Sequence, residues 1–221
     1  MRRKLYIIGA GGFGREVLQW CSEIPPESRD WDVAGFMDND RSMLSKYACD
    51  VPIVGSERTF TPSEGDIFFC AIGSPQIRLK VTAQLEARGF EFISIIHPSA
   101  KVGERCHIGA GSILCPNTIL TCDVTIGKHC ILNCFATAGH DASMGDGCTL
   151  NTFCIITGFS KLGKGVLMGT HSQVVPGVAV GDFVVIGAGS AVVRPVASNT
   201  TVLGVPAAVI FQKDAPVAEA N

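Results

Sequence analysis

Hydrophobic residues recur at every sixth position through the C-terminal half of the chain. The series runs from Val102 to Val192, and all sixteen members are apolar. Because 47% of the residues are hydrophobic, such a run arises by chance only about once in 10^5. The positions are Val102, Ile108, Leu114, Leu120, Ile126, Leu132, Ala138, Met144, Leu150, Ile156, Leu162, Met168, Val174, Val180, Ile186 and Val192. A six-residue period of this kind predicts a parallel β-helix.

A second series, four residues after each of these positions, holds only small residues. It runs Cys106, Ser112, Thr118, Val124, Cys130, Ala136, Ala142, Cys148, Cys154, Ser160, Val166, Ser172, Val178, Val184, Ser190 and Val196. Glycine follows the apolar position at Gly109, Gly127, Gly145, Gly163 and Gly181, a spacing of eighteen. We therefore predict three short strands per coil and about five coils, with one large and one small inward residue per strand. The glycines are expected to form the tight corners between flat faces.

The N-terminal half instead alternates apolar runs with stretches of helical spacing. This alternation predicts a small parallel α/β sheet. We place a domain boundary at residue 96, giving an α/β domain over 1–96 and a β-helix over 97–221. The expected strands are 4–9, 33–37, 67–72 and 90–96, and the expected helices are 15–24 and 75–88.

A glycine-rich turn follows the first expected strand. Gly9, Gly11 and Gly14 match the G-x-G-x-x-G pattern, and Asp38 ends the second strand. Loop amides and a helix N-terminus would hold phosphate there, and Asp38 would hold a ribose or a base. A dinucleotide domain needs two mononucleotide halves, and 96 residues supply only one. A mononucleotide or a nucleotide sugar therefore fits better, and a tight turn without a ligand is the alternative.

Charge and cysteine content exclude several other classes. The net charge is −2, and the one basic cluster is Arg2, Arg3 and Lys4, which argues against nucleic acid or an anionic membrane as partner. Because no apolar stretch reaches about 20 residues, we expect a soluble, cytoplasmic protein. The ten cysteines form no C-x-x-C pair and predict no metal site. Cys106, Cys130, Cys148 and Cys154 occupy small inward positions, which predicts a structural role.

Five motifs together resemble the hexapeptide-repeat sugar acetyltransferases of the sialic acid O-acetyltransferase type. That family includes bacterial enzymes that N-acetylate UDP- or dTDP-linked 4-amino sugars. The motifs are Ile7-Ile8-Gly9-Ala10-Gly11-Gly12, Ala71-Ile72-Gly73, Ile96-His97-Pro98-Ser99-Ala100, Gly139-His140-Asp141 and Gly204-Val205-Pro206-Ala207. The resemblance implies a half-Rossmann domain followed by a left-handed parallel β-helix. It also implies a homotrimer, with acetyl-CoA in the groove between neighbouring coils.

The resemblance also assigns roles to individual residues. It makes His140 the general base, with Asp141 beside it, and makes the Gly158 amide the donor to the thioester oxygen. Two further sets follow from it: Gly11, Gly12, Phe13, Asp38, Asn39 and Gly73 for the nucleotide sugar, and Gly158, Thr170, His171 and Pro176 for acetyl-CoA.

Two departures from the family pattern leave the charge partner of His140 open. Gly139 stands where an acidic residue often precedes the histidine, and Thr149 stands where some relatives have a second histidine. On an extended strand, adjacent side chains point to opposite faces, so Asp141 would point away from the imidazole.

The other histidines have simpler interpretations. His107 and His129 fall outside the inward positions and are expected on the surface, and His97 is expected to cap or hinge the domain junction. His171 either lines the coenzyme groove or is merely exposed.

The favoured function is acetyl-CoA-dependent N-acetylation of a nucleotide-linked 4-amino-6-deoxy sugar. Histidine suits the base because its pKa is ordinarily near 6.5. O-acetylation of sialic acid or another sugar hydroxyl is the alternative, because the same base and oxyanion donor would serve it. An NAD(P)-dependent sensor and a non-catalytic nucleotide-binding scaffold are the other classes, and binding of acetyl-CoA would argue against both.

Overall fold

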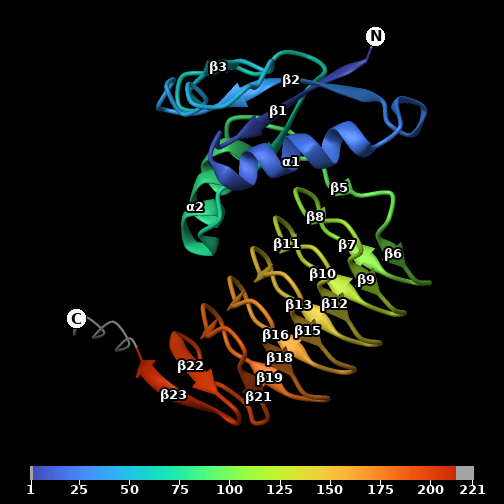
Figure 1. Ribbon diagram of the computed structural model, residues 1–221, viewed down its shortest axis with the longest axis vertical. Helices are drawn as coiled ribbons and strands as arrows, with labels where there is room; N and C mark the ends of the chain where they lie inside the picture. The colour runs from blue at the N-terminus through green and yellow to red at the C-terminus, as the bar shows by residue number, and fades with distance from the viewer. Residues whose placement is uncertain (1, 213–221) are drawn as a thin grey trace.

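The computed structural model describes residues 2–212, and it divides into a small α/β domain and a long β-helix (Figure 1). The α/β domain lies over the first coils, and the coils then run away from it toward the C-terminal hairpin. The predicted fold class, a small α/β domain followed by a parallel β-helix of hexapeptide repeats, is confirmed.

The α/β domain is built on one four-stranded parallel sheet in the order β3-β2-β1-β4. Its strands are β1 (Arg3–Ile8), β2 (Trp31–Met37), β3 (Ile53–Gly55) and β4 (Asp66–Cys70), and its helices are α1 (Gly12–Glu23), η1 (Pro26–Ser28) and α2 (Pro75–Glu86). The apolar runs of β1 and β4 are buried, as expected for parallel strands covered on both faces. Strand β3 was missed because its three residues are not fully buried and form no long apolar run.

The β-helix has three flat faces, and each of its two-residue strands pairs in parallel with a strand eighteen residues away in the sequence. The first face holds β5 (Ile95–Ile96), β8 (Ile113–Leu114), β11 (Ile131–Leu132), β14 (Thr149–Leu150), β17 (Leu167–Met168), β20 (Val185–Ile186), β22 (Thr200–Gly204) and β23 (Ala207–Gln212). The second face holds β6 (Lys101–Val102), β9 (Ile119–Leu120), β12 (Thr137–Ala138), β15 (Ile155–Ile156), β18 (Gln173–Val174) and β21 (Ala191–Val192). The third face holds β7 (His107–Ile108), β10 (Thr125–Ile126), β13 (Ser143–Met144), β16 (Lys161–Leu162) and β19 (Ala179–Val180).

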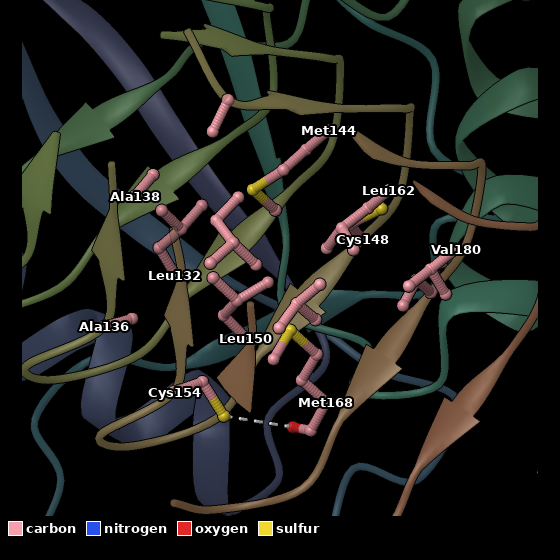
Figure 2. Close-up of a cluster of buried hydrophobic side chains, with 14 of the residues drawn as sticks. Leu132, Ala136, Ala138, Met144, Cys148, Leu150, Cys154, Leu162, Met168 and Val180 are labelled. Carbon is pink, nitrogen blue, oxygen red and sulfur yellow. Dashed lines mark hydrogen bonds between the residues drawn. The ribbon is translucent and has the colours of Figure 1, made fainter. Parts of the chain in front are cut away.

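Both predicted inward series fill the interior of the coil, as the close-up of the core shows (Figure 2). The large series is buried from Leu114 to Val192, whereas Val102 is 43% exposed because no complete coil covers the N-terminal end. Cys130, Cys148 and Cys154 are buried free thiols, and Cys154 Sγ donates to Gly169 O at 3.0 Å. These three cysteines therefore have the predicted structural role, whereas Cys106 is only half-buried.

The eighteen-residue glycine series has a different cause from the one predicted. The corners are formed two residues further on, where a residue with φ near +60° recurs every six positions, as at Asn117, Asp123 and Asp141. Gly127 is not among the residues with positive φ. A Cβ at Gly127 would instead lie 2.7 Å from the carbonyl carbon of Gly145 in the next coil. The glycines therefore permit close stacking of the coils, and the corner prediction was wrong.

The α/β domain covers the first face of the coil. Outward-pointing Ile113 and Ile131 of this face are buried, whereas outward Ile119 and Ile155 of the second face are about 40% exposed. The expected strand 90–96 is split between the two domains. Phe92 bridges to Phe68 in the α/β sheet, and β5 pairs with β8 in the coil. Between residues 92 and 95 the chain thus stops pairing with the α/β sheet and starts pairing with the β-helix, shortly before the predicted boundary at residue 96.

Two histidines lie at this domain contact. His97 is buried, with its Nε2 2.8 Å from Glu23 Oε2 of α1 and its Nδ1 2.8 Å from Ser99 Oγ, as expected for a capping residue at the junction. His129 is 3% exposed beneath α2, with its Nε2 3.0 Å from Glu86 Oε1. The surface position predicted for His129 is therefore wrong, because α2 covers that corner, whereas His107 is exposed as expected.

Candidate active site

His140 and Asp141 form the corner between the second and third faces. The Nδ1 atom of His140 lies 2.9 Å from Asp141 Oδ2, and both side chains are exposed. Asp141 has φ 59°, so the backbone is not extended there and the two side chains point the same way. The expectation that Asp141 would point away was wrong because it assumed strand geometry at a left-handed corner residue.

Gly158 lies under the imidazole of His140, one coil further along the same corner. A Cβ at Gly158 would lie 2.6 Å from His140 Nε2, so the ring occupies the space that glycine leaves. The backbone N–H of Phe159 donates to His140 O at 3.0 Å. The phenyl ring of Phe159 meets the imidazole of His140 edge-on, with 5.1 Å between the ring centroids. Within residues 2–212, the Gly158 N–H has no hydrogen-bond acceptor. A free backbone donor therefore lies beside the imidazole.

The missing acidic residue at position 139 has a steric explanation. A Cβ at Gly139 would lie 2.7 Å from Gly158 N, so a carboxylate side chain there would collide with the next coil. Asp141 supplies a carboxylate from the other side of His140. Because a carboxylate accepts from the Nδ1–H tautomer, Nε2 is left with its lone pair. This arrangement can remove a proton at Nε2 and donate a hydrogen bond from Gly158.

The residues predicted to contact acetyl-CoA lie along two different corners. Pro176 is exposed one coil beyond Gly158, followed by Gly177 with φ 75°. Thr170 and His171 lie on the corner between the first and second faces. There His171 stacks on Phe153, and Phe153 stacks on Phe135, with 4.8 Å between centroids in each pair. The two groups flank the second face.

The glycine loop after β1 has the geometry that its motif predicts. Gly9 has φ +98°, which suits glycine alone, and a Cβ at Gly14 would collide with Gly9 O. Gly11 is the N-cap of α1 and has no side chain to satisfy the first-turn amides. These amides are therefore available to an anion.

Asp38 and Asn39 hold the loops around this turn. Asp38 Oδ2 accepts from Ala10 N–H at 2.9 Å, and its Oδ1 accepts from Asp40 N–H at 3.0 Å. Asn39 Oδ1 accepts from Ser56 Oγ at 2.7 Å. Asp38 thus joins the loop after β2 to the glycine loop, so its carboxylate already has a structural role.

A cavity of about 300 Å³ lies beside Gly11 and Gly12. It contains two cationic side chains that sequence reasoning missed, Arg15 and Lys46, and the Arg15 guanidinium lies 3.4 Å from the centre of the Tyr47 ring. A basic residue in the first turn after a glycine loop was the available signal for Arg15. The remaining lining residues are Ala10, Asp40, Ser42, Met43 and Ser45.

Four of the predicted substrate residues do not line this cavity: Phe13, Asp38, Asn39 and Gly73. Phe13 is half-buried against the core of the α/β domain, and exposed Gly73 follows β4. The glycine loop and His140 are also separated within one chain. The α/β domain covers the first face, and His140 lies on the corner opposite that face.

No helix among the described residues is long and apolar enough to cross a membrane. The same part of the chain holds no group of three or more His, Cys, Asp or Glu side chains suited to a metal ion.

Sequence comparison matches the chain to a known domain family and to a curated relative. Residues 4–85 match the family model of the PglD N-terminal domain. The GDP-perosamine N-acetyltransferase of Escherichia coli O157:H7 is 28% identical over 137 residues. That alignment covers 61% of this chain and 61% of the relative's length.

Structure comparison extends the match to nearly the whole chain. The acetyltransferase domain of PglB from Neisseria gonorrhoeae FA1090 superposes with a TM-score of 0.86 and 25% identity, over 95% of this chain and 100% of the other. PerB from Caulobacter crescentus, solved with CoA and GDP-perosamine, gives a TM-score of 0.83 and 30% identity. This second match covers 94% of this chain and 97% of PerB. With both domains matched in the same order, the chain belongs to the hexapeptide-repeat sugar acetyltransferases.

Proposed function

We propose that the protein transfers an acetyl group from acetyl-CoA to the amino group of a nucleotide-linked 4-amino-6-deoxy sugar. The observation that carries this proposal is the arrangement around His140. Asp141 lies on its Nδ1, and Gly158 lies against its Nε2 with a backbone N–H that has no acceptor within residues 2–212. The CoA and GDP-perosamine bound by the Caulobacter relative support the choice of both substrates.

The chemistry assigned to these residues is general-base catalysis with oxyanion stabilisation. His140 Nε2 takes the proton from the sugar ammonium or attacking amine, and Asp141 stabilises the resulting imidazolium. The Gly158 N–H donates to the carbonyl oxygen as negative charge develops there. The C–N bond forms, the C–S bond breaks, and the proton on His140 passes to the leaving thiolate.

The acceptor's diphosphate is assigned to the cavity beside the glycine loop. Gly11 and Gly12 present backbone at the N-terminus of α1, and Arg15 and Lys46 supply positive charge. Charge-assisted hydrogen bonds to phosphate are stronger than neutral ones. Asp38 fixes the loop that carries Ala10, and its contact to a ribose or a base stays a prediction from the sequence.

We propose that the working form is a homotrimer. Apolar side chains on and beside the second face are left exposed by residues 2–212 of their own chain, including Ile119, Phe135, Phe153 and Ile155. A second copy packed here would bring its own α/β domain toward His140, which one chain alone does not do. The groove between copies would then hold acetyl-CoA, with Thr170 and His171 on one side and Gly158 and Pro176 on the other. Use of acetyl-CoA and a nucleotide sugar agrees with a cytoplasmic location.

Thiol release from acetyl-CoA tests the reaction directly. Wild type is assayed with GDP-perosamine, with UDP- and dTDP-linked 4-amino-6-deoxy sugars, and with sialic acid. Rapid release with one amino sugar and an amide product identified by mass spectrometry support the proposal. Thiol release with sialic acid alone would indicate O-acetylation instead. Nucleotide binding without any thiol release would indicate a non-catalytic nucleotide-binding scaffold.

Subunit complementation tests the shared site. His140→Ala lacks the base, and Arg15→Glu reverses charge in the nucleotide cavity. Co-expression of the two inactive variants should restore part of the activity if one copy's acceptor domain serves the next copy's His140. Full assembly to a trimer without any restored activity would contradict a site shared between copies.

A further inference from the structure

Arg78 of α2 is fully buried at the contact between the two domains, with 0% of its surface exposed. Its Nε donates to His129 O at 2.8 Å, and its Nη2 donates to Gly147 O at 2.8 Å and to Thr149 Oγ1 at 2.8 Å. These three acceptors belong to two successive coils of the β-helix. The guanidinium therefore fixes α2 to the coil at one point.

The same guanidinium also holds the loop that follows β4. Arg78 Nη1 donates to Ile72 O at 2.7 Å and to Gly73 O at 3.1 Å. Ile72 and Gly73 lie at the carboxyl end of β4, next to β1, whose own carboxyl end carries the glycine loop. One planar side chain thus joins the nucleotide-side edge of the sheet to the β-helix.

The surroundings of Arg78 show that the contact demands a specific geometry. Among the described residues, no carboxylate lies within ion-pair distance of the guanidinium, so backbone carbonyl dipoles offset its charge. Burial lowers the pKa of Arg78, and the hydrogen bonds must compensate for that cost. A buried apolar contact would join the domains with a smaller desolvation penalty. The planar guanidinium of Arg78 instead fixes the orientation of α2 and the loop after β4 relative to the β-helix.

Close approach of α2 supports the same interpretation. A Cβ at Gly147 would lie 2.6 Å from Leu79 Cδ1, so the side chain of Leu79 fills the space that glycine leaves at this position. The far end of α2 is held by Glu86 and His129. The helix is therefore fixed at both ends on one corner of the coil.

We propose that Arg78 is a positioning residue for acetyl transfer. It sets the placement of the acceptor-binding domain on its own β-helix. In the proposed trimer, this placement aligns the bound sugar's amino group with the base and the thioester at the neighbouring copy. This inference rests on the proposed function. It concerns residues that contact neither substrate, and it predicts an effect on turnover with little effect on binding.

Arg78→Met and Arg78→Lys test this role, with Arg88→Met as the matched control. Arg88 is a second arginine, two residues after α2, and among the described residues it donates only to Glu57 O and Phe60 O inside the α/β domain. Turnover of the amino sugar is measured together with Kd for the free nucleoside diphosphate, Kd for CoA, and the slow hydrolysis of acetyl-CoA without acceptor. Because misplacement by about 1 Å can reduce rates about 10^2-fold, kcat in Arg78→Met should fall at least about tenfold.

The two Kd values and the acceptor-free hydrolysis should stay within about twofold of wild type, with Arg78→Lys intermediate and Arg88→Met unaffected. A folded Arg78→Met with wild-type kcat would overturn the proposal, as would weakened nucleotide binding that accounts for the whole loss. If Arg78→Met does not fold, the isosteric Thr149→Val provides the test, because it removes the hydrogen bond from Arg78 Nη2 to Thr149 Oγ1. Its kcat should fall while its Kd values for nucleoside diphosphate and CoA stay unchanged. Absence of amino-sugar acetylation by wild type would instead reject the proposed function.

Discussion

The imidazole of His140 occupies the space above Gly158 in the next coil, where a Cβ would lie 2.6 Å from its Nε2 atom. The eighteen-residue spacing between them is one complete coil, so the repeat itself brings the two residues together. Position 158 must therefore remain glycine for the base to stay in place.

Gly158→Ala should abolish most of the activity while leaving the coil folded. The methyl group displaces the imidazole from the Gly158 N–H, and rates depend steeply on such placement, so we expect a loss of about 10^2-fold or more in kcat. Thiol release measures kcat, and circular dichroism confirms the fold. Gly55→Ala is the control, because a Cβ at Gly55 meets no atom within 4 Å. Unchanged turnover in Gly158→Ala would show that this contact is not needed.

His140→Ala should reduce turnover on the order of 10^2-fold or more, because a general base contributes roughly this factor. Binding of acetyl-CoA, measured by calorimetry, should be largely kept. His107→Ala removes an exposed histidine of the third face and should have wild-type turnover. A near-wild-type rate in His140→Ala would remove this residue from the mechanism.

Asp141→Asn should have an intermediate effect. The amide can keep a hydrogen bond to Nδ1 but carries no charge, and a charge-assisted bond exceeds a neutral one by about 1 kcal/mol. We therefore expect kcat/KM to fall about fivefold, with the difference from wild type decreasing at high salt because both groups are exposed. A loss as large as that of His140→Ala would mean that Asp141 does more than stabilise the imidazolium.

Arg15→Met should weaken binding of the nucleoside diphosphate. Loss of a charge-assisted hydrogen bond to phosphate, worth roughly 1.5–3 kcal/mol, raises Kd about tenfold to 100-fold. Calorimetric titration with GDP, UDP and dTDP measures the change. Arg58→Met, an exposed arginine of the same domain, is the control and should bind like wild type. Equal affinities in all three proteins would place the phosphates elsewhere.

His129 should make the domain contact sensitive to mild acid. Burial lowers the pKa of His129, and the hydrogen bond that its Nε2–H donates to Glu86 offsets this only in part. At a pH between the ordinary histidine pKa near 6.5 and the lower pKa of folded His129, the unfolded chain binds more protons than the folded one. The free energy of unfolding therefore falls as pH falls. It changes by at most about 1.4 kcal/mol per pH unit.

Urea unfolding at pH 7.5 and 5.5 measures this effect as the difference between wild type and His129→Gln. Wild type should lose more stability than the variant on acidification. If both proteins lost the same free energy of unfolding on acidification, His129 would not be the cause of the acid sensitivity.

Much of the fold followed from local patterns in the sequence. The sixteen-member apolar series predicted the coil because its interior is narrow and admits one large and one small residue per strand. The glycine loop was predicted because positive φ at Gly9 and close packing at Gly14 demand glycine within a few residues of chain. Family resemblance added His140 and Gly158, and their spacing of one coil agreed with the repeat.

Tertiary structure decided what depends on contacts between distant segments or on the conformation of a single corner. The left-handed φ of Asp141 turned its carboxylate toward His140, although a strand would have pointed it away. Packing of α2 against the coil buried His129 and Arg78, and folding of the 40–47 loop placed Lys46 and Tyr47 beside Arg15. A periodic sequence specifies its own coil because each repeat meets an equivalent neighbour. Where two different domains meet, no period exists, and the burial and partners of each side chain depend on which surfaces fit together.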